Sequence, residues 1–157
     1  MNIQEQILRI QEMMGLNENK TYQIYVDMGG VLFKKMGADD GGQGDTTSYI
    51  GGELWDGIKQ YNPIILSARG TKNIETNEKI KTKQVEDFLY PTPQIIFVGS
   101  GSEKGNNGRS NANSILIDDD ANNISSWISK GGKGIQHDSN NVQSTLDKLN
   151  KIITKLT

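Results

Sequence analysis

The sequence lacks cysteine altogether, which removes several kinds of chemistry at once. Without thiols the chain forms no disulfide bond, no thiolate metal site and no cysteine nucleophile. A chain without cysteine suits a reducing compartment.

The sequence also lacks an excess of positive charge and any long apolar run. Lys and Arg number 17 against 19 Asp and Glu, a net charge of -2, so no global basic surface exists to bind nucleic acid sequence-specifically. The longest apolar runs fall far short of the ~20 residues that span a bilayer. The start, Met1–Glu5, is neither basic nor uniformly apolar, so we expect a cytoplasmic protein without a signal peptide or membrane partner.

The length of 157 residues, 34% of them hydrophobic, fits one domain over residues 1–157. Both ends carry apolar residues at helical spacing. Helices are predicted over 1–16 and 140–157, with stripes formed by Ile3, Ile7, Ile10 and Met14, and by Val142, Leu146, Leu149, Ile153 and Leu156. We expect these stripes to pack onto the domain; self-association into a homodimer is the alternative.

Short, continuous apolar runs between these helices are typical of buried parallel strands. They are Ile24–Val26, Ile64–Leu66, Ile95–Val98 and Ile115–Ile117. Segments with helical spacing alternate with them, at 53–60, 75–89 and 121–130. This alternation predicts a doubly wound, Rossmann-like α/β fold with a mostly parallel sheet flanked by helices.

Two stretches rich in Gly and small polar residues, 37–52 and 99–113, do not fit this alternation. Loops of that length in a compact domain are usually functional lids or mobile segments. The insertion at 34–52 is long enough for a flap but too short for a large cap domain. We therefore expect an open site.

Polar residues stand where the apolar runs end. Asp27, Ser67 and Asp118 end or follow three of the runs, and Lys104 lies in the loop after another. Parallel strands direct their C-terminal ends to one edge of the sheet, so these groups are predicted to meet there. Asp27 and Asp118 would repel each other unless a cation lay between them, and a hard ion with oxygen ligands, Mg²⁺, resolves that conflict.

These residues carry a resemblance to a known family. The segment Ile24–Phe33 resembles the first motif of the haloacid-dehalogenase-like (HAD) phosphohydrolases, a strand followed by D-x-D-G-[TV]-[LF]. Ile65–Ser67, Ser102–Lys104 and Ile115–Asp119 are similar to the second, third and fourth motifs, in the family's order. The resemblance covers roughly residues 22–136 and is strongest to the small deoxyribonucleotidase-type branch.

The resemblance implies a Mg²⁺-dependent phosphatase that acts on a small phosphorylated substrate such as a nucleotide. Asp27 would attack phosphorus and form an aspartyl-phosphate, while Ser67 and Lys104 would neutralise and orient the phosphoryl oxygens. The metal ligands it implies are Asp27, the Gly29 carbonyl, and Asp118 or Asp119; Asp118, as the strand terminus, is slightly preferred. The substrate-binding residues are Gly30, Ser67, Ala68, Arg69 and Lys104.

One position departs from the family pattern. Gly29 stands where the family has a second Asp that protonates the leaving oxygen and then activates water. Losing a general acid/base typically costs about 10² to 10⁴ in rate, or roughly 3 to 5.5 kcal/mol of barrier. An acid in or beside the insertion could take its place, but acids in Gly-rich loops are usually solvated; the candidates are Asp39, Asp40, Asp45 and Glu53. A weakened phosphatase is expected, and an inactive phosphate-binding or regulatory module is the alternative.

Several other aromatic and charged residues could have either a functional or a structural role. Tyr49 and Trp55 suit stacking on a base, although packing is the commoner role. His137, the only histidine, is interpreted as structural. A local group of basic residues follows the second apolar run: Arg69, Lys72, Lys79, Lys81 and Lys83. These residues could bind a second phosphate of the substrate or form a solvated helix face, and the solvated face is favoured.

A dinucleotide-binding turn is the rival interpretation of the loop that starts at Gly99. The segment Gly99–Gly105 follows a strand, and Asp118 closes the next strand. The third glycine is one position late, however, and residues 106–113 have almost no helix-forming or apolar residues to receive a pyrophosphate. We therefore reject this interpretation.

Overall fold

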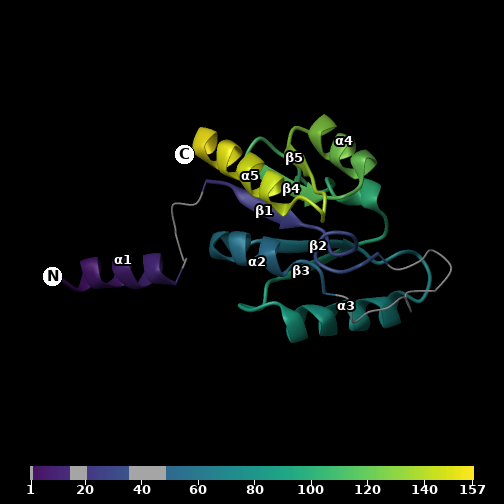
Figure 1. Ribbon diagram of the computed structural model, residues 1–157, viewed down its shortest axis with the longest axis horizontal. Helices are drawn as coiled ribbons and strands as arrows, with labels where there is room; N and C mark the ends of the chain where they lie inside the picture. The colour runs from purple at the N-terminus through teal and green to yellow at the C-terminus, as the bar shows by residue number, and fades with distance from the viewer. Residues whose placement is uncertain (1, 15–20, 36–48) are drawn as a thin grey trace.

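The computed structural model describes residues 2–14, 21–35 and 49–157 (Figure 1). Its centre is a parallel sheet of five strands in the order β3-β2-β1-β4-β5. The strands are β1 Gln23–Val26, β2 Ile64–Ala68, β3 Ile95–Val98, β4 Ser114–Asp118 and β5 Lys133–Gln136. This arrangement confirms the predicted doubly wound, Rossmann-like α/β fold, and no large cap is present among the described residues.

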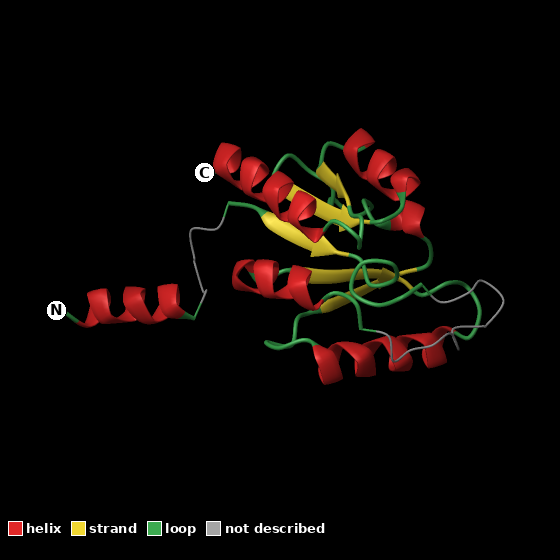
Figure 2. Ribbon diagram, in the orientation of Figure 1, coloured by secondary structure: helices red, strands yellow, loops and turns green. Residues whose placement is uncertain are grey.

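Helices cover both faces of the sheet (Figure 2). They are α2 Gly52–Ile58, α3 Ile74–Phe88, α4 Ala121–Ser129 and α5 Val142–Leu156, with short 3-10 helices at Lys59–Tyr61 and Gly101–Glu103. Alternate strand residues point to opposite faces. Thus Ile24 and Val26 lie in one core cluster with α2, α3 and α5, while Leu116 packs with α4 in the other.

The start of α4 shows how the sequence sets an element boundary. Asp120 precedes the helix with extended backbone, and its side chain accepts hydrogen bonds from the N–H groups of Asn122 and Asn123. An N-cap of this kind satisfies backbone donors that have no partner inside the helix. The position of Asp120 therefore fixes the turn that follows β4.

The two terminal helices differ in how their apolar stripes are covered. In α5, Leu149 is 1% exposed and lies in the core, as expected from the spacing. In α1 (Ile3–Met13), Ile3 is 76% exposed and Met13 is 84% exposed, and the helix stands apart from the sheet (Figure 1). The prediction that the first stripe packs onto the domain is therefore wrong. No helix in the described part of the chain is long and apolar enough to cross a membrane.

The stretch 99–113, expected to be a lid or a mobile segment, is folded against the domain. Arg109 donates hydrogen bonds to the carbonyls of Glu103 and Lys104, and Lys130 of α4 donates to the Ser102 carbonyl and the Asn106 side chain. Beyond the 3-10 helix Gly101–Glu103, residues 99–113 form turns and bends without an α-helix. The rejection of a dinucleotide-binding turn is consistent with this structure.

Packing accounts for the aromatic residues near the insertion. The ring of Tyr49 lies 5.4 Å from that of Phe33 and 5.2 Å from that of Phe88. Trp55 is 3% exposed, and its indole N–H donates to the carbonyl of Tyr90. Both residues therefore take the packing role. Asp39, Asp40 and Asp45 of the insertion lie outside the described residues.

His137 joins the last strand to the last helix. It is buried, and its Nδ1 lies 2.7 Å from the hydroxyl oxygen of Thr145 in α5. Burial lowers the pKa of the imidazole, although Asp138 and Asp119 oppose this effect. His137 is therefore structural, as the sequence indicated, and the fold favours its neutral form.

This lowered pKa predicts a pH dependence of stability. Below about pH 6.5 the unfolded chain binds a proton at His137 more readily than the folded chain, so the free energy of unfolding decreases as the pH falls. His137→Gln should show a smaller decrease between about pH 7 and about pH 5. Urea unfolding of both proteins across this pH range gives the free energy of unfolding of each. Groups that titrate in both proteins cancel when one pH profile is subtracted from the other. Parallel profiles would contradict the prediction.

Candidate active site

The order of the strands brings the predicted carboxylates together. β1 and β4 are neighbours in the sheet, with Val26 paired to Ile117. Asp27 therefore follows directly after β1, with its N–H donating to the Ile117 carbonyl, and Asp118 ends β4 beside it. Both strands end at the same edge of the sheet because they are parallel.

Lys104 lies between these two carboxylates. Its Nζ is 2.9 Å from Asp27 Oδ1 and 2.6 Å from Asp118 Oδ2, and the residue is 2% exposed. Burial lowers the pKa of Lys104, but the negative charges of Asp27 and Asp118 outweigh burial and leave the pKa raised. The cation expected between the carboxylates is thus supplied in part by the chain itself.

Asp27 is a buried carboxylate with a strongly altered titration. Burial raises its pKa to about 6, an effect that Lys104 opposes and Asp118 reinforces. At neutral pH Asp27 is mainly ionised, as a nucleophile must be. Its Oδ1 is held by Lys104, so the carboxylate has a defined orientation.

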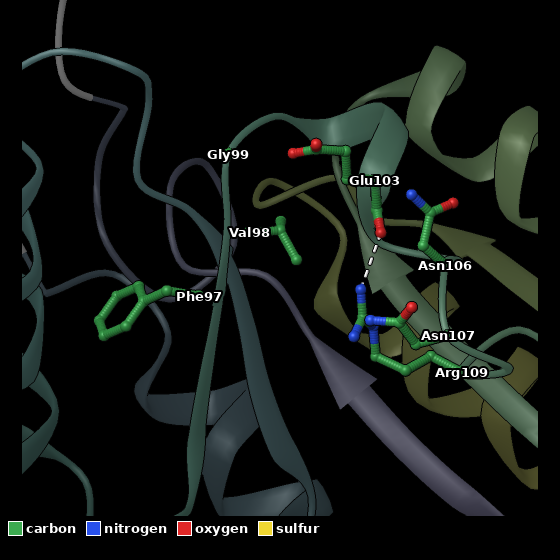
Figure 3. Close-up of a pocket in the computed structure, with 7 residues that line it drawn as sticks. All are labelled: Phe97, Val98, Gly99, Glu103, Asn106, Asn107 and Arg109. Carbon is green, nitrogen blue, oxygen red and sulfur yellow. Dashed lines mark hydrogen bonds between the residues drawn. The ribbon is translucent and has the colours of Figure 1, made fainter.

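The loop after β3 holds Lys104 in place and borders a separate pocket. Arg109 donates to the carbonyls of Glu103 and Lys104 at 2.8 and 2.7 Å, which fixes the turn that carries the lysine. A pocket of about 220 Å³ lies beside this turn (Figure 3). Its lining residues are Phe97, Val98, Gly99, Glu103, Asn106, Asn107 and Arg109. The Asp27–Lys104–Asp118 cluster does not line this pocket.

Three carboxylates are placed to hold a metal ion. Oxygen atoms of Asp27, Asp118 and Asp119 all lie within 4.8 Å of one another. Both oxygens of Asp118 already accept hydrogen bonds, Oδ1 from the N–H of Asp120 and Oδ2 from Lys104 and Asn123. Asp119 Oδ1, by contrast, is buried without a hydrogen-bond partner.

This donor set fits Mg²⁺, which prefers carboxylate oxygens and rarely needs an all-protein cage. The unpartnered oxygen makes Asp119 the better direct ligand, whereas Asp118 is slightly preferred from the sequence because it ends the strand. Asp119 Oδ2 is 2.9 Å from the Nζ of Lys35. The ion pair with Asp119 raises the pKa of Lys35, although burial opposes it. Nothing in the sequence distinguished Lys35 as a residue of this site.

Gly30 is required by the position of Asp119. Its φ is +80°, and a Cβ at this position would collide with Asp119 Oδ2. Any side chain would therefore displace the carboxylate as well as strain the backbone. The N–H of Gly30 already donates to the carbonyl of Phe33. The substrate contact predicted for Gly30 thus stays a prediction, and the structure gives the residue a steric role.

Position 29 has space for a side chain. A Cβ on Gly29 would meet only Lys35, at 3.8 Å from its Cγ and 4.0 Å from its Cα, which are ordinary contacts. The φ angle of Gly29 is not positive. The missing aspartate is therefore not excluded by sterics. Glu53, weighed as a substitute acid, is an exposed residue in the first turn of α2.

Ser67 is the fourth predicted residue at this edge, and its partner was not predicted. Ser67 is 0% exposed in β2, and its Oγ accepts a hydrogen bond from Lys81 Nζ at 2.7 Å. Lys81 also donates to the carbonyl of Ala68, a predicted substrate-binding residue, at 2.8 Å. The solvated-face interpretation is therefore wrong for Lys81.

Three of the other four basic residues on or near α3 pair with acids, while Lys72 is exposed and forms no ion pair within the described part of the chain. Lys79 pairs with Glu75 and Lys83 with Asp87, both on the exposed surface, as a solvated face predicts. Arg69 Nε lies 3.3 Å from Glu78 Oε1, so its predicted substrate contact competes with this ion pair. Spacing places Lys81 on the same helix face as Asn77 and Val85, four residues to either side, but only the structure shows that this face is buried.

Neither the family models nor the curated proteins searched contain a match to this chain. The candidate site therefore rests on the geometry of its own residues. That geometry combines a buried lysine shared by two carboxylates, a third carboxylate with a free oxygen, and a buried hydroxyl held by a second lysine.

Metal binding at Asp119 gives the first test of this site. Because a ligand that binds only the folded state stabilises it by mass action, Mg²⁺ at about 100 times its Kd should add about 2.7 kcal/mol to the free energy of unfolding. The expected result is a higher Tm in Mg²⁺ than in EDTA. Asp119→Asn should abolish the difference, because it weakens the ligand that has the free oxygen.

Asp120→Ala is the matched control for this experiment. It removes an adjacent acid that serves only as the N-cap of α4, so it should lower stability by about 1 kcal/mol. It should still show the full increase in Tm with Mg²⁺. Equal responses of wild type and Asp119→Asn to Mg²⁺ would refute the assignment of the metal site.

Proposed function

We propose that this chain is a HAD-like phosphomonoester hydrolase that acts through an aspartyl-phosphate on Asp27. The observation that supports it most is the buried ammonium of Lys104 shared by Asp27 and Asp118. Burying ionised groups costs several kcal/mol each, and well-packed apolar residues of similar size at the same positions would often give an equally stable fold. Such a cluster at the ligand-binding edge of an α/β sheet is therefore better explained by chemistry than by stability.

Asp27 has the features of the nucleophile. Lys104 holds Oδ1, which leaves Oδ2 to attack phosphorus. The bond from phosphorus to the leaving oxygen then breaks, and its electron pair goes to that oxygen. In the second step a water oxygen attacks phosphorus, the bond to Asp27 breaks, and the carboxylate and orthophosphate are released. One difficult displacement is thus divided into two easier ones.

The surrounding groups serve to position the phosphoryl group and balance its charge. The Ser67 hydroxyl donates to a phosphoryl oxygen, and Lys104 keeps the nucleophile oriented during the attack. A bound Mg²⁺, held by Asp27, Asp119 and Asp118, would supply further positive charge beside the same oxygens. The substrate we propose is a small phosphorylated molecule such as a nucleotide.

Gly29 favours one alternative function, a phosphate-binding or regulatory module without turnover. No carboxylate at position 29 can protonate the leaving oxygen. A substrate whose leaving group departs readily as an anion needs little protonation. The hydrolase proposal therefore implies a preference for such substrates, while the alternative implies binding alone.

Hydrolysis of nitrophenyl phosphate distinguishes the two functions. With Mg²⁺ the wild type should release nitrophenol, and Asp27→Asn should reduce the rate to background because its amide cannot displace the leaving group. Colorimetric turnover and isothermal titration with orthovanadate are measured on the same samples. Vanadate binding without any wild-type turnover would favour the binding module and overturn the hydrolase.

Restoring the missing acid tests the role of position 29. Gly29→Asp should raise turnover of alkyl phosphates by something within the range of about 10² to 10⁴ that general acid/base catalysis supplies. The increase should be smaller for nitrophenyl phosphate, since its leaving group needs little protonation. Steady-state kcat on both substrates measures the effect.

Gly29→Asn is the control, because it adds nearly the same volume without a titratable proton. It should leave alkyl-phosphate turnover at the wild-type level. A folded, Mg²⁺-binding Gly29→Asp protein with no gain over Gly29→Asn would show that position 29 is not the acid/base position.

A further inference from the structure

The face of α3 that meets the sheet is unusually polar. Asn77 and Gln84 are each 8% exposed, and Val85 is the buried apolar residue of the helix. Lys81 lies one turn from each and is half-buried on the same face. A helix that only covers a sheet normally presents an apolar stripe there. Asn77 donates to the carbonyls of Arg69 and Lys72 and so holds the turn before α3. Lys81 is the charged residue of this face, and it calls for a role other than packing.

The ammonium of Lys81 is held by neutral oxygens. It donates to Ser67 Oγ at 2.7 Å and to the Ala68 carbonyl at 2.8 Å. No carboxylate of the described residues forms an ion pair with it, unlike its exposed neighbours Lys79 and Lys83. Burial lowers the pKa of Lys81, and the charge of Asp27 opposes this effect. Lys81 is thus a partly desolvated cation that lies near the nucleophile without an anion of its own.

The hydrogen bonds leave donors available beside Asp27. An ammonium has three N–H groups, and Lys81 uses two of them. Because Ser67 Oγ accepts from Lys81, its own O–H remains a donor, and no acceptor for it exists within the described part of the chain. Ser67 and Lys81 therefore present two donors and one positive charge together.

Lys104 is less suited to bind the substrate by itself. Two carboxylates share its charge, and they take two of its three N–H groups. A phosphoryl group brings about two further negative charges to the same edge of the sheet. The three carboxylates Asp27, Asp118 and Asp119 would also offset the combined charge of Lys104 and a bound Mg²⁺. The phosphoryl charge therefore calls for a further cation that is not already balanced by a carboxylate.

We propose that Lys81 binds an oxygen of the phosphoryl group directly, and that Ser67 and Lys81 form the anion-binding half of the site. Lys104 then serves mainly to orient Asp27 and Asp118. This inference rests on the proposed function and adds a catalytic residue to it. The ligand class it specifies is a tetrahedral oxyanion with at least two negative charges.

Titration with inorganic phosphate tests this role. In the presence of Mg²⁺, Lys81→Met should weaken phosphate binding roughly 10- to 100-fold, the loss typical of a hydrogen bond between charged groups. Lys81→Arg should recover most of the affinity, because it restores the charge. Lys83→Met, which alters an exposed residue two positions away on α3, should bind phosphate as the wild type does. Mg²⁺ affinity should be the same in all four proteins.

Lys81→Gln is measured beside Lys81→Met so that loss of charge is tested even if the apolar side chain disturbs folding. Its amide can still donate to a neutral oxygen, and it should show the same loss of phosphate affinity with a Tm near that of wild type. Unchanged phosphate affinity in the neutral variants, together with normal wild-type turnover, would overturn the role of Lys81 and leave the hydrolase intact. Phosphate binding that the neutral variants weaken, without any wild-type turnover, would overturn the hydrolase and leave the role of Lys81 intact. Failure of the wild type both to bind phosphate and to hydrolyse any phosphate ester would overturn both.

Discussion

The buried contact of Lys104 with Asp27 and Asp118 is the constraint on which this site depends. Two carboxylates at the ends of adjacent parallel strands repel each other in a low-dielectric environment, and a cation must balance them. The chain supplies that cation from the loop after β3, which crosses toward β4 through a short 3-10 helix and no α-helix. The hydrogen bonds of Arg109 and Lys130 hold this loop, so residues far from Asp27 help to set the charge around it.

Around this contact the polar groups divide into two sets with different charges. On the β4 side, Asp119 keeps an unpartnered oxygen beside Gly30, where only a glycine fits. On the β2 side, Ser67 and Lys81 carry donors and a positive charge. A cation bound on the β4 side and an anion bound on the β2 side would each balance charge that the chain's own residues leave unbalanced. A phosphate ester with Mg²⁺ meets both requirements at once.

Much of this arrangement follows from local sequence pattern. Continuous apolar runs predicted four of the five strands, β1 to β4, and the polar residues that end them predicted the meeting of Asp27, Ser67 and Asp118 at one edge. The deduction works because parallel strands place their C-terminal ends together whatever the details of packing. Asp120 likewise acts at short range, as the cap of the helix that it precedes.

Tertiary structure alone decided the rest. Lys79, Lys81 and Lys83 are the same residue type on one helix, and only the orientation of α3 against β2 turns Lys81 toward Ser67 and leaves the others in solvent. The apolar stripes of α1 and α5 are similar in sequence, yet only α5 is covered by the core. Spacing reveals which side chains share a face, but not what that face meets. That depends on contacts between residues distant in the chain, which no local pattern contains.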